Sequence, residues 1–508
     1  MITEATEMNW FNIGATVLYM LILVVIGLAM NKKVKSRDDY WVGGRQIGPV
    51  VTAMSYCAAY YSTVMVIGGP SMIYRYGICY MMPNMLGATF TTGILIFLIL
   101  ALKMRVVAGR TGSVSLPGFL AVRYESKLIG LISAILIAIL MIPYGVSVLK
   151  GIADGFTVLG GVPYETGVVV ISIVAALYLV SSGYWGIAWT DLIQGILISL
   201  GMVVLTVYVV NTAGGVTHMM NKITAEFPEK VASPPGTFNN IFQCLSICWV
   251  WQLIAFGQPQ LVTKFLGLKD PRTIKTIVRV SVPWIAIFLM CSGLIGMGGL
   301  YFYGGNVANP DRISPALAFA SGSLLLQALF LIAAVAAGLS TLVALVLTSS
   351  AAVTRDIYED YYCSRVGAVP DGKKSIRLSR IVTVVVLLLM MFLALHPWDF
   401  VWEMSTLAAG TMGAGFAAPI MVGLYWKKAT RKGAVSAVIT GVLVDVVWYV
   451  AGLSDLVHPF LPGMVVSFMT IYIVSLITQP VSKQTISMFF DKHYSREAKN
   501  IPAAVAAE

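Results

Sequence analysis

The 508-residue chain is 58% hydrophobic and only 11% charged, and its mean hydropathy is +0.83. A soluble globular domain carries about 25% charged residues, so this composition excludes that class. The net charge of +11 would suit a nucleic-acid-binding protein, but the placement of the charges argues for a different origin. We therefore expect no nucleic-acid partner.

Apolar runs of roughly 20 residues recur along the whole sequence, and each can cross a hydrocarbon core of about 30 Å as a helix. They predict an all-α polytopic membrane protein, with one transmembrane domain over residues 1–508 embedded in a lipid bilayer. We expect about 13 transmembrane helices. In chain order their cores are 10–30, 47–74, 80–102, 128–157, 167–183, 189–212, 240–263, 278–303, 322–352, 380–395, 399–426, 433–452 and 460–478.

Lys and Arg residues gather in alternate connections between these helices. Apart from Arg75, Lys150, Lys222, Lys230 and Arg312, all lie in segments 31–46, 103–127, 264–279, 354–380, 427–432 and 483–499. The positive-inside rule predicts that these loops face the cytoplasm of a cell (inner) membrane protein. The N-terminus is then outside, and residues 480–508 form a short cytoplasmic tail.

Two of the expected helices are interrupted. Residues 58–63 are polar within the second helix, and residues 255–259 interrupt the seventh, where Pro259 removes an amide donor. Such segments persist at membrane depth only where they line a cavity enclosed by protein. Because the two helices are five apart, they predict inverted five-helix repeats over 46–213 and 239–427, with a binding site near the midplane.

Several short segments resemble the sodium:solute symporter family over nearly the whole chain. They are Tyr40 to Arg45, Ala188 to Gly195, Phe256 to Pro259, and Ser340 and Thr341 followed by Thr354 to Tyr358. Within the family, segments 67–70, 161–167 and 423–426 are most similar to the sodium/pantothenate symporter branch.

The resemblance implies a LeuT-type fold and a symporter that imports a small organic acid together with Na+ by alternating access. Pantothenate is the first expectation for the solute. The alternative is a short monocarboxylate or an amino acid such as proline.

A sodium site between the second and ninth helices is also implied by the resemblance. Its expected ligands are the carbonyl oxygens of Ala58, Tyr61 and Ala337 and the hydroxyls of Ser340 and Thr341. The chemistry agrees, since unwound carbonyls beside hydroxyls supply oxygen ligands without a buried carboxylate. In the alternative interpretation, the two hydroxyls bond only to their own helix.

Asp191 is the most conspicuous ionisable residue near a predicted membrane boundary. It is expected to be an ion-path or structural group, and a helix-capping role on the cytoplasmic side is the alternative. Relatives with a second sodium site use an aspartate matching Asp191 together with serines where this chain has Val343 and Ala344. The lost hydroxyls predict one sodium ion per solute.

The interrupted helices supply most of the expected solute contacts. Lys150, inside the fourth helix, is a further candidate because its ammonium could meet a carboxylate; the alternative is that it extends outward to the headgroups. The complete set of expected solute-binding residues is Tyr60, Ser62, Thr63, Lys150, Trp251, Gln252 and Gln258.

Other functional classes have weaker support. A channel would need a filter sequence, and an enzyme would need a nucleophile with a base or paired metal ligands. A transporter-like sensor would carry added signalling domains. We therefore expect no catalytic residue and no bound organic cofactor, and the sequence leaves the oligomeric state open.

Overall fold

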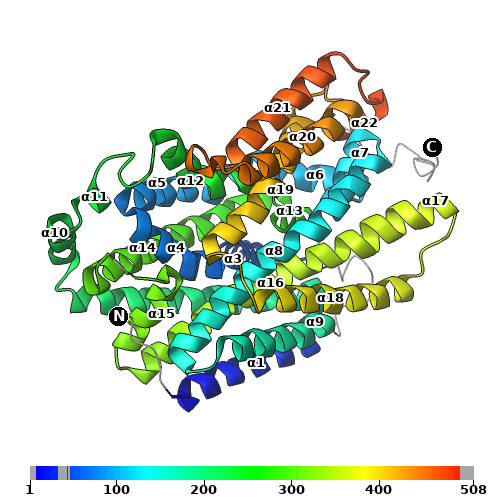
Figure 1. Cartoon of the computed structure of the whole chain (residues 1–508). Coiled ribbons are helices and arrows are strands. Elements are labelled where there is room, and N and C mark those ends of the chain that lie inside the picture. The colour runs from blue at the N-terminus through cyan, green and yellow to red at the C-terminus, as the bar shows by residue number, and fades with distance from the viewer. Residues whose placement is uncertain (1–6, 32–42, 44–45, 306, 492–508) are drawn as a thin grey trace.

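The computed structural model of the chain describes residues 7–31, 43, 46–305 and 307–491 (Figure 1). Regular structure within these residues is helical, apart from an isolated bridge between Ile47 and Leu268. The all-α fold class is confirmed. Residues 492–508 of the predicted tail and most of the segment from Tyr40 to Arg45 lie outside the described residues.

The first part of the chain forms α1 (Trp10–Asn31), α3 (Pro49–Tyr60), η2 (Val64–Gly68), α4 (Gly69–Tyr76), α5 (Ile78–Phe90), η3 (Thr91–Ala101), α6 (Leu102–Thr111), α7 (Leu116–Tyr124), α8 (Lys127–Gly160) and α9 (Tyr164–Thr212). The middle part forms α10 (Val216–Glu226), α11 (Pro228–Val231), α12 (Ile241–Ile254), η4 (Ala255–Gly257), α13 (Pro259–Leu266), η5 (Pro271–Thr273), α14 (Ile274–Tyr303), η6 (Pro310–Arg312), α15 (Ile313–Ala320), α16 (Leu324–Ala351), η7 (Ala352–Cys363) and α17 (Ser364–Val366). The last part forms α18 (Gly372–Ala394), α19 (Val401–Tyr425), α20 (Arg431–Val450), η8 (Leu453–Asp455), α21 (Phe460–Leu476) and α22 (Lys483–Phe490).

Among the described residues, nine helices are long and apolar enough to cross a membrane, or up to eleven if each of two bent pairs is one span. Two shorter apolar helices, Tyr164–Leu179 and Phe460–Leu476, lie at the remaining predicted positions. A helix as short as α21 measures about 26 Å, less than the hydrocarbon thickness of about 30 Å. The polytopic class is confirmed, whereas the count of 13 is not.

The long segment α9 contains two of the predicted spans and folds back on itself. In a straight helix Tyr178 and Thr190 would lie about 18 Å apart, yet their hydroxyls share a hydrogen bond. The turn therefore lies between Tyr178 and Thr190. The part of α9 after the turn packs against α3, where Met54 lies against Gly195.

Both interrupted helices are broken as the sequence predicts. The chain bends by 58° between Pro49–Tyr60 and Val64–Tyr76, and by 45° between Ile241–Gly257 and Pro259–Leu266. At the second break Gln258 is extended, with φ −81° and ψ 116°, and Pro259 begins α13. The residue before a proline is driven out of the helical region, which explains the position of this break.

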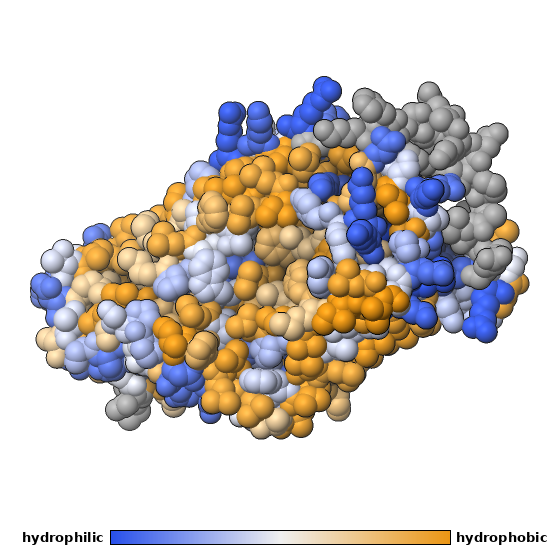
Figure 2. Space-filling view, turned by 90° about the horizontal axis from the view of Figure 1, so that it is seen from above, coloured by the Kyte–Doolittle hydropathy of each residue, from blue (hydrophilic) through white to orange (hydrophobic). Residues whose placement is uncertain are grey.

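Two helices form the centre of the molecule. The apolar windows of Leu324–Val366 and Val401–Tyr425 are 89% and 83% buried, against 28% for α1 and for Lys374–Ala394 at the periphery. Figure 1 shows α16 between α8 and α9, with α1 outside them. In Figure 2, hydrophobic side chains cover much of the flank and hydrophilic ones gather towards the ends. This distribution suits a helix bundle in a bilayer.

The last turn of α19 is held by a side chain from a neighbouring helix. Arg123 of α7 is fully buried, and its Nε and Nη2 atoms donate to the carbonyls of Gly423 at 2.6 Å and Trp426 at 3.0 Å. The last carbonyls of a helix have no partner within it, so Arg123 satisfies them and attaches α19 to α7.

Candidate functional site

The predicted sodium ligands come together where α3 ends against the middle of α16. Ser340 Oγ donates to the carbonyls of Ala58 at 2.8 Å and Ala337 at 3.0 Å. Thr341 Oγ1 donates to the carbonyl of Ala59, not Ala58, at 3.1 Å. Tyr61 follows at the helix end, where its amide donates to Cys57 at 2.8 Å. Ser340 therefore bonds to its own helix, as the alternative predicts, and also to α3.

A glycine makes this close approach possible. A Cβ on Gly338 would lie 2.2 Å from Ile152 Cδ1 of α8 and 3.1 Å from Thr63 Cγ2. Only a residue without a side chain fits between α8, α16 and the break. The oxygen cluster next to Gly338 is buried, and Ser340 and Thr341 are 1% and 0% exposed. Hard cations such as Na+ favour oxygen ligands of this kind.

A small cavity of about 270 Å³ lies between the two broken helices. Its wall is aromatic on one side, with the rings of Tyr60 and Tyr61 4.9 Å apart and those of Tyr60 and Trp251 6.2 Å apart. The Tyr60 hydroxyl donates to the Trp251 carbonyl and so joins α3 to α12. The cavity is lined by Tyr60, Tyr61, Val64, Met65, Asn84, Ala88 and Trp251.

Buried polar atoms without partners surround the breaks. Trp251 Nε1, Gln252 Oε1 and Gln258 Nε2 form no hydrogen bond. Gln252 Nε2 is held by the Asn84 carbonyl at 3.3 Å, while Gln258 Oε1 accepts from Gln260 Nε2 at 2.5 Å. Unpaired buried donors and acceptors cost free energy, and a bound polar solute would satisfy them.

Ser62 and Thr63, also expected at the solute site, form local contacts instead. Ser62 Oγ accepts from the amide of Val64 at 3.1 Å and so supports the start of η2. Thr63 Oγ1 donates to the Val148 carbonyl of α8 at 3.4 Å. Asn84 was missed, because a single amide in an apolar helix gives no pattern that points to a partner.

Lys150, the expected solute contact inside the fourth helix, has its ammonium paired with two carboxylates in this structure. Its Nζ donates to Asp154 Oδ2 at 2.9 Å and Asp311 Oδ2 at 2.7 Å. Asp311 Oδ2 also accepts from the amide of Val401 at 3.0 Å. Lys150 is 7% exposed and its ammonium has two carboxylate partners, so it does not extend to the headgroups, and a solute carboxylate would have to compete with Asp154 and Asp311.

Asp191 is paired by a residue that sequence reasoning missed. Its Oδ2 accepts from Ser55 Oγ at 2.5 Å and from Lys264 Nζ at 3.1 Å. Lys264 Nζ also donates to Ser55 Oγ at 2.5 Å. All three residues are buried, and they join α3, α9 and α13. Asp191 lies inside α9, so the helix-cap alternative is wrong. Lys264 was missed because its charge was assigned to a basic loop.

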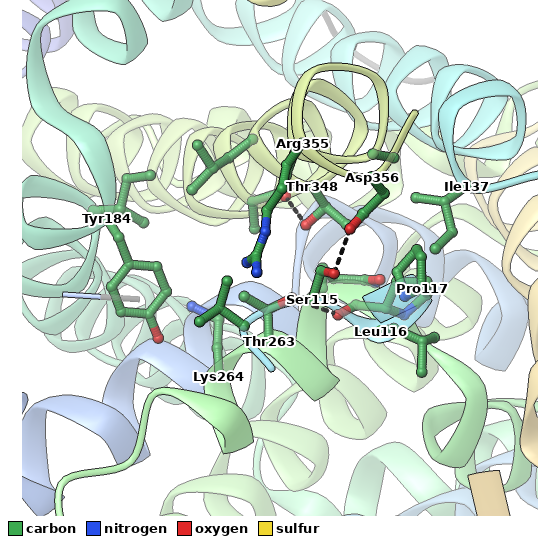
Figure 3. A pocket seen from close by; sticks show the side chains of 18 residues that line it. Ser115, Leu116, Pro117, Ile137, Tyr184, Thr263, Lys264, Thr348, Arg355 and Asp356 are labelled. Atoms are coloured by element: carbon green, nitrogen blue, oxygen red, sulfur yellow. Dashed lines mark hydrogen bonds between the residues drawn. The ribbon is translucent and has the colours of Figure 1, made fainter. Parts of the chain in front are cut away.

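Two larger cavities lie on either side of the small one. Along the α12 to α13 pair, Gln243 and Ile247 line an outer cavity of about 800 Å³, and Trp251 lines the central one. Gln260 and Lys264 line an inner cavity of about 600 Å³ (Figure 3). The order of these residues along one broken helix places the central cavity between the other two.

The outer cavity carries its own ion pair. The Arg75 guanidinium donates to Glu403 Oε1, and Trp402 Nε1 donates to the Tyr80 hydroxyl at 3.1 Å. These contacts join α4 and α5 to the first turns of α19. One cavity thus lies on each side of the central one along the broken helix of α12 and α13.

The helical fold, with its two broken spans, is of the LeuT type. The chain is similar in structure to a Na+-coupled sialic acid symporter solved in a substrate-bound outward-open state, with a TM-score of 0.81 and 19% identity over 94% of this chain and 100% of that one. It is also similar to MhsT in complex with L-phenylalanine, with a TM-score of 0.52 and 15% identity over 85% and 98% of the two chains.

The chain belongs to the sodium:solute symporter family, whose sequence model matches residues 40–441. It is 27% identical over 487 residues to the high-affinity proline transporter PutP of Bacillus subtilis (strain 168), which covers 92% of this chain and 98% of that protein. It is also 27% identical over 497 residues to a sodium/proline symporter of Staphylococcus aureus, covering 94% and 95%.

The family assignment confirms the resemblance noted in the sequence, and with it sodium as the co-transported ion. The narrower resemblance to the pantothenate branch is not supported, because the relatives named above are proline transporters. Short signatures such as segments 67–70 and 161–167 were too brief to separate branches of one family.

Proposed function

We propose that the chain imports a small zwitterionic amino acid of the proline type together with sodium. The observation that carries this is the small aromatic pocket between the two broken helices, beside buried polar atoms that lack partners. Trp251 Nε1 and Gln258 Nε2 are donors suited to a carboxylate, and Gln252 Oε1 is an acceptor suited to an ammonium. The proline-transporting relatives support this solute over pantothenate, which is longer.

The sodium ion in this proposal binds at the carbonyls of Ala58, Tyr61 and Ala337 with the hydroxyls of Ser340 and Thr341. The contacts of Ser340 with Ala58 and Ala337 support that assignment. On binding, the hydroxyl hydrogens turn away from these carbonyls so that the oxygens face the cation. The ion then joins α3 to α16 more tightly than the hydrogen bonds do.

The proposal includes the membrane orientation and the repeats. The N-terminus is outside and the C-terminus cytoplasmic, so the inner cavity faces the cytoplasm. Residues 46–213 and 239–427 form the two inverted repeats. The two bends, of 58° and 45°, support this division, since each lies in the first helix of its repeat.

Radiotracer uptake into proteoliposomes tests the proposal. An inward sodium gradient should drive accumulation of labelled proline, and an equal potassium gradient should not. Unlabelled proline should compete, whereas pantothenate and short monocarboxylates should not. Sodium-driven uptake of pantothenate that proline leaves unchanged would contradict the assignment of the solute.

Trp251→Phe and Gln252→Glu are the matched variants for the central cavity. Trp251→Phe keeps an aromatic ring but removes the unpaired donor together with part of the ring system, so it should raise the half-saturating proline concentration about ten-fold. Trp249, which is exposed on the same helix, supplies the control Trp249→Phe. Equal effects of the two tryptophan variants would argue against a solute contact at Trp251.

A further inference from the structure

The inner cavity holds charged side chains that the sodium and solute sites do not use. Its wall includes Lys264 from α13 and Arg355 and Asp356 from η7. Figure 3 shows Arg355 pointing into the cavity on the side of Lys264, with Asp356 beside Ser115. The remaining wall is largely apolar and includes Leu116, Ile137 and Leu347.

Lys264 brings no unbalanced charge to this cavity. Its ammonium is 3.1 Å from Asp191 Oδ2 and also donates to Ser55. A buried ion pair of this kind is neutral as a unit, and its cation is already coordinated. Lys264 therefore does not account for the binding of a further anion.

Arg355 is different, because its guanidinium is only weakly paired. The anion nearest to its Nε is Asp360 Oδ2, 3.9 Å away on a side chain that is 52% exposed. Its Nη1 atom is buried and forms no hydrogen bond. A guanidinium carries five N–H donors arranged for a carboxylate. One end of this side chain is thus free to bind an anionic group from the cavity.

Asp356 provides the complementary charge. It is 5% exposed, and its Oδ1 accepts from Ser115 Oγ at 2.6 Å. Its Oδ2 has no hydrogen-bond partner, and neither has Oε1 of Gln260 in the same wall. A buried carboxylate oxygen without a partner favours a bound cation or ammonium.

We propose that Arg355 and Asp356 form an exit subsite that receives the transported amino acid from the central cavity before its release. The carboxylate of the solute binds Arg355, its ammonium binds Asp356, and its side chain lies against the apolar wall. This inference rests on the proposed function, because it requires a zwitterionic solute. Pantothenate, which has no ammonium, would leave Asp356 without a partner.

The subsite predicts an asymmetry between the two faces of the membrane. Arg355→Gln should raise the half-saturating proline concentration about ten-fold for transport that starts from the inner-cavity side. From the opposite side the value should stay within about two-fold of wild type. Vesicles of both orientations supply the two measurements. A normal value from the opposite side also demonstrates that the variant is folded.

Solute analogues separate the two halves of the subsite. Prolinamide lacks the carboxylate, so its inhibition from the inner-cavity side should be unchanged in Arg355→Gln. Tetrahydrofuroate lacks the ammonium, so its inhibition should be unchanged in Asp356→Asn, which keeps an acceptor for Ser115. Arg355→Lys, which keeps the charge, should lose less affinity than Arg355→Gln. Equal losses for proline and prolinamide in Arg355→Gln would overturn the proposal.

Controls distinguish this inference from the function on which it rests. Arg365→Gln removes a cation that bonds to Tyr361 near the same helix end, outside the inner cavity, and should leave both faces unchanged. Chloride and sulfate are tested as inhibitors from the inner-cavity side. If these ions inhibit wild type, and Arg355→Gln abolishes that inhibition without changing the affinity for proline, Arg355 belongs to an inorganic anion site instead. Absence of sodium-driven proline uptake in wild type would reject the proposed function itself, whereas normal uptake without the asymmetry rejects only the subsite.

Discussion

Ser340 in α16 donates its hydroxyl hydrogen to the carbonyl of Ala58 in α3 across 2.8 Å, although the two residues are 282 positions apart in the chain. This contact brings the first broken helix to the helix that runs through the centre of the bundle. A cation that binds both oxygens in place of this hydrogen bond would bridge the same two elements. This contact and the neighbouring polar contacts lead to four predictions.

Removing either hydroxyl should weaken sodium binding. In Ser340→Ala and Thr341→Ala, the sodium concentration for half-maximal proline uptake should rise roughly ten-fold, because each variant deletes an oxygen ligand. Ser349→Ala is the control, since it removes a hydroxyl of the same helix that bonds to Ala138. Unchanged sodium dependence in both variants, at normal expression, would remove the site from this position.

We predict that one sodium ion accompanies each solute. Val343 and Ala344 carry no hydroxyls, and Asp191 is already paired with Lys264, so a second cation has few ligands. One sodium ion with a zwitterion moves one net charge, worth about 2.3 kcal/mol per 100 mV. The reversal potential of proline flux in proteoliposomes measures this number. A shift with voltage that requires two charges would contradict the prediction.

Breaking the ion pair of Lys264 and Asp191 should destabilise the protein more than removing both charges together. Lys264→Met leaves a buried carboxylate without its cation, a loss of about 3–5 kcal/mol. Adding Asp191→Asn removes the uncompensated charge, so the double variant should regain most of the thermal stability measured in detergent. Lys275→Met on α14 is a control at an exposed position. A double variant as unstable as Lys264→Met would mean that the ion pair is not the cause.

Lys150 should affect the stability of the protein and not its selectivity for the charge of the solute. Because its ammonium is held by Asp154 and Asp311, Lys150→Gln should lower the melting temperature and affect the transport of acids and amides equally. Uptake of proline and inhibition by prolinamide, measured side by side, check this. A selective loss of the acid would restore the solute contact that the sequence suggested.

Whether a structural feature could be predicted from the sequence depends on whether neighbouring residues determine it. The breaks at 58–63 and 255–259 were predictable, because Pro259 and a run of hydroxyls are visible within a single helix. The turn inside α9 was expected after residue 183, and the contact between Tyr178 and Thr190 places it between these two residues. Apolar composition locates spans well and their ends poorly.

Partners that lie far apart in the chain were not predictable. Lys150 was examined for a solute because nothing in its own helix indicates Asp311, which is 161 residues away. Lys264 was counted with a basic loop, although α13 buries it against Asp191. A single sequence gives the residue types of such pairs, but the packing that joins them depends on the whole bundle. Ser340 and Thr341 stand out as neighbouring hydroxyls in an apolar helix, but a family resemblance supplied their partners.

The contact of Arg123 with the end of α19 gives the two ends of this helix different mechanical partners. Since a buried guanidinium holds the carbonyls of Gly423 and Trp426, we expect α7 and the last turn of α19 to move together. The first turns of α19 instead contact α4 through the ion pair of Arg75 and Glu403 at the outer cavity. Distances between pairs of spectroscopic labels test this expectation. A label pair on α7 and the end of α19 should give one constant distance through the transport cycle. A label pair on α4 and the start of α19 should give two different distances.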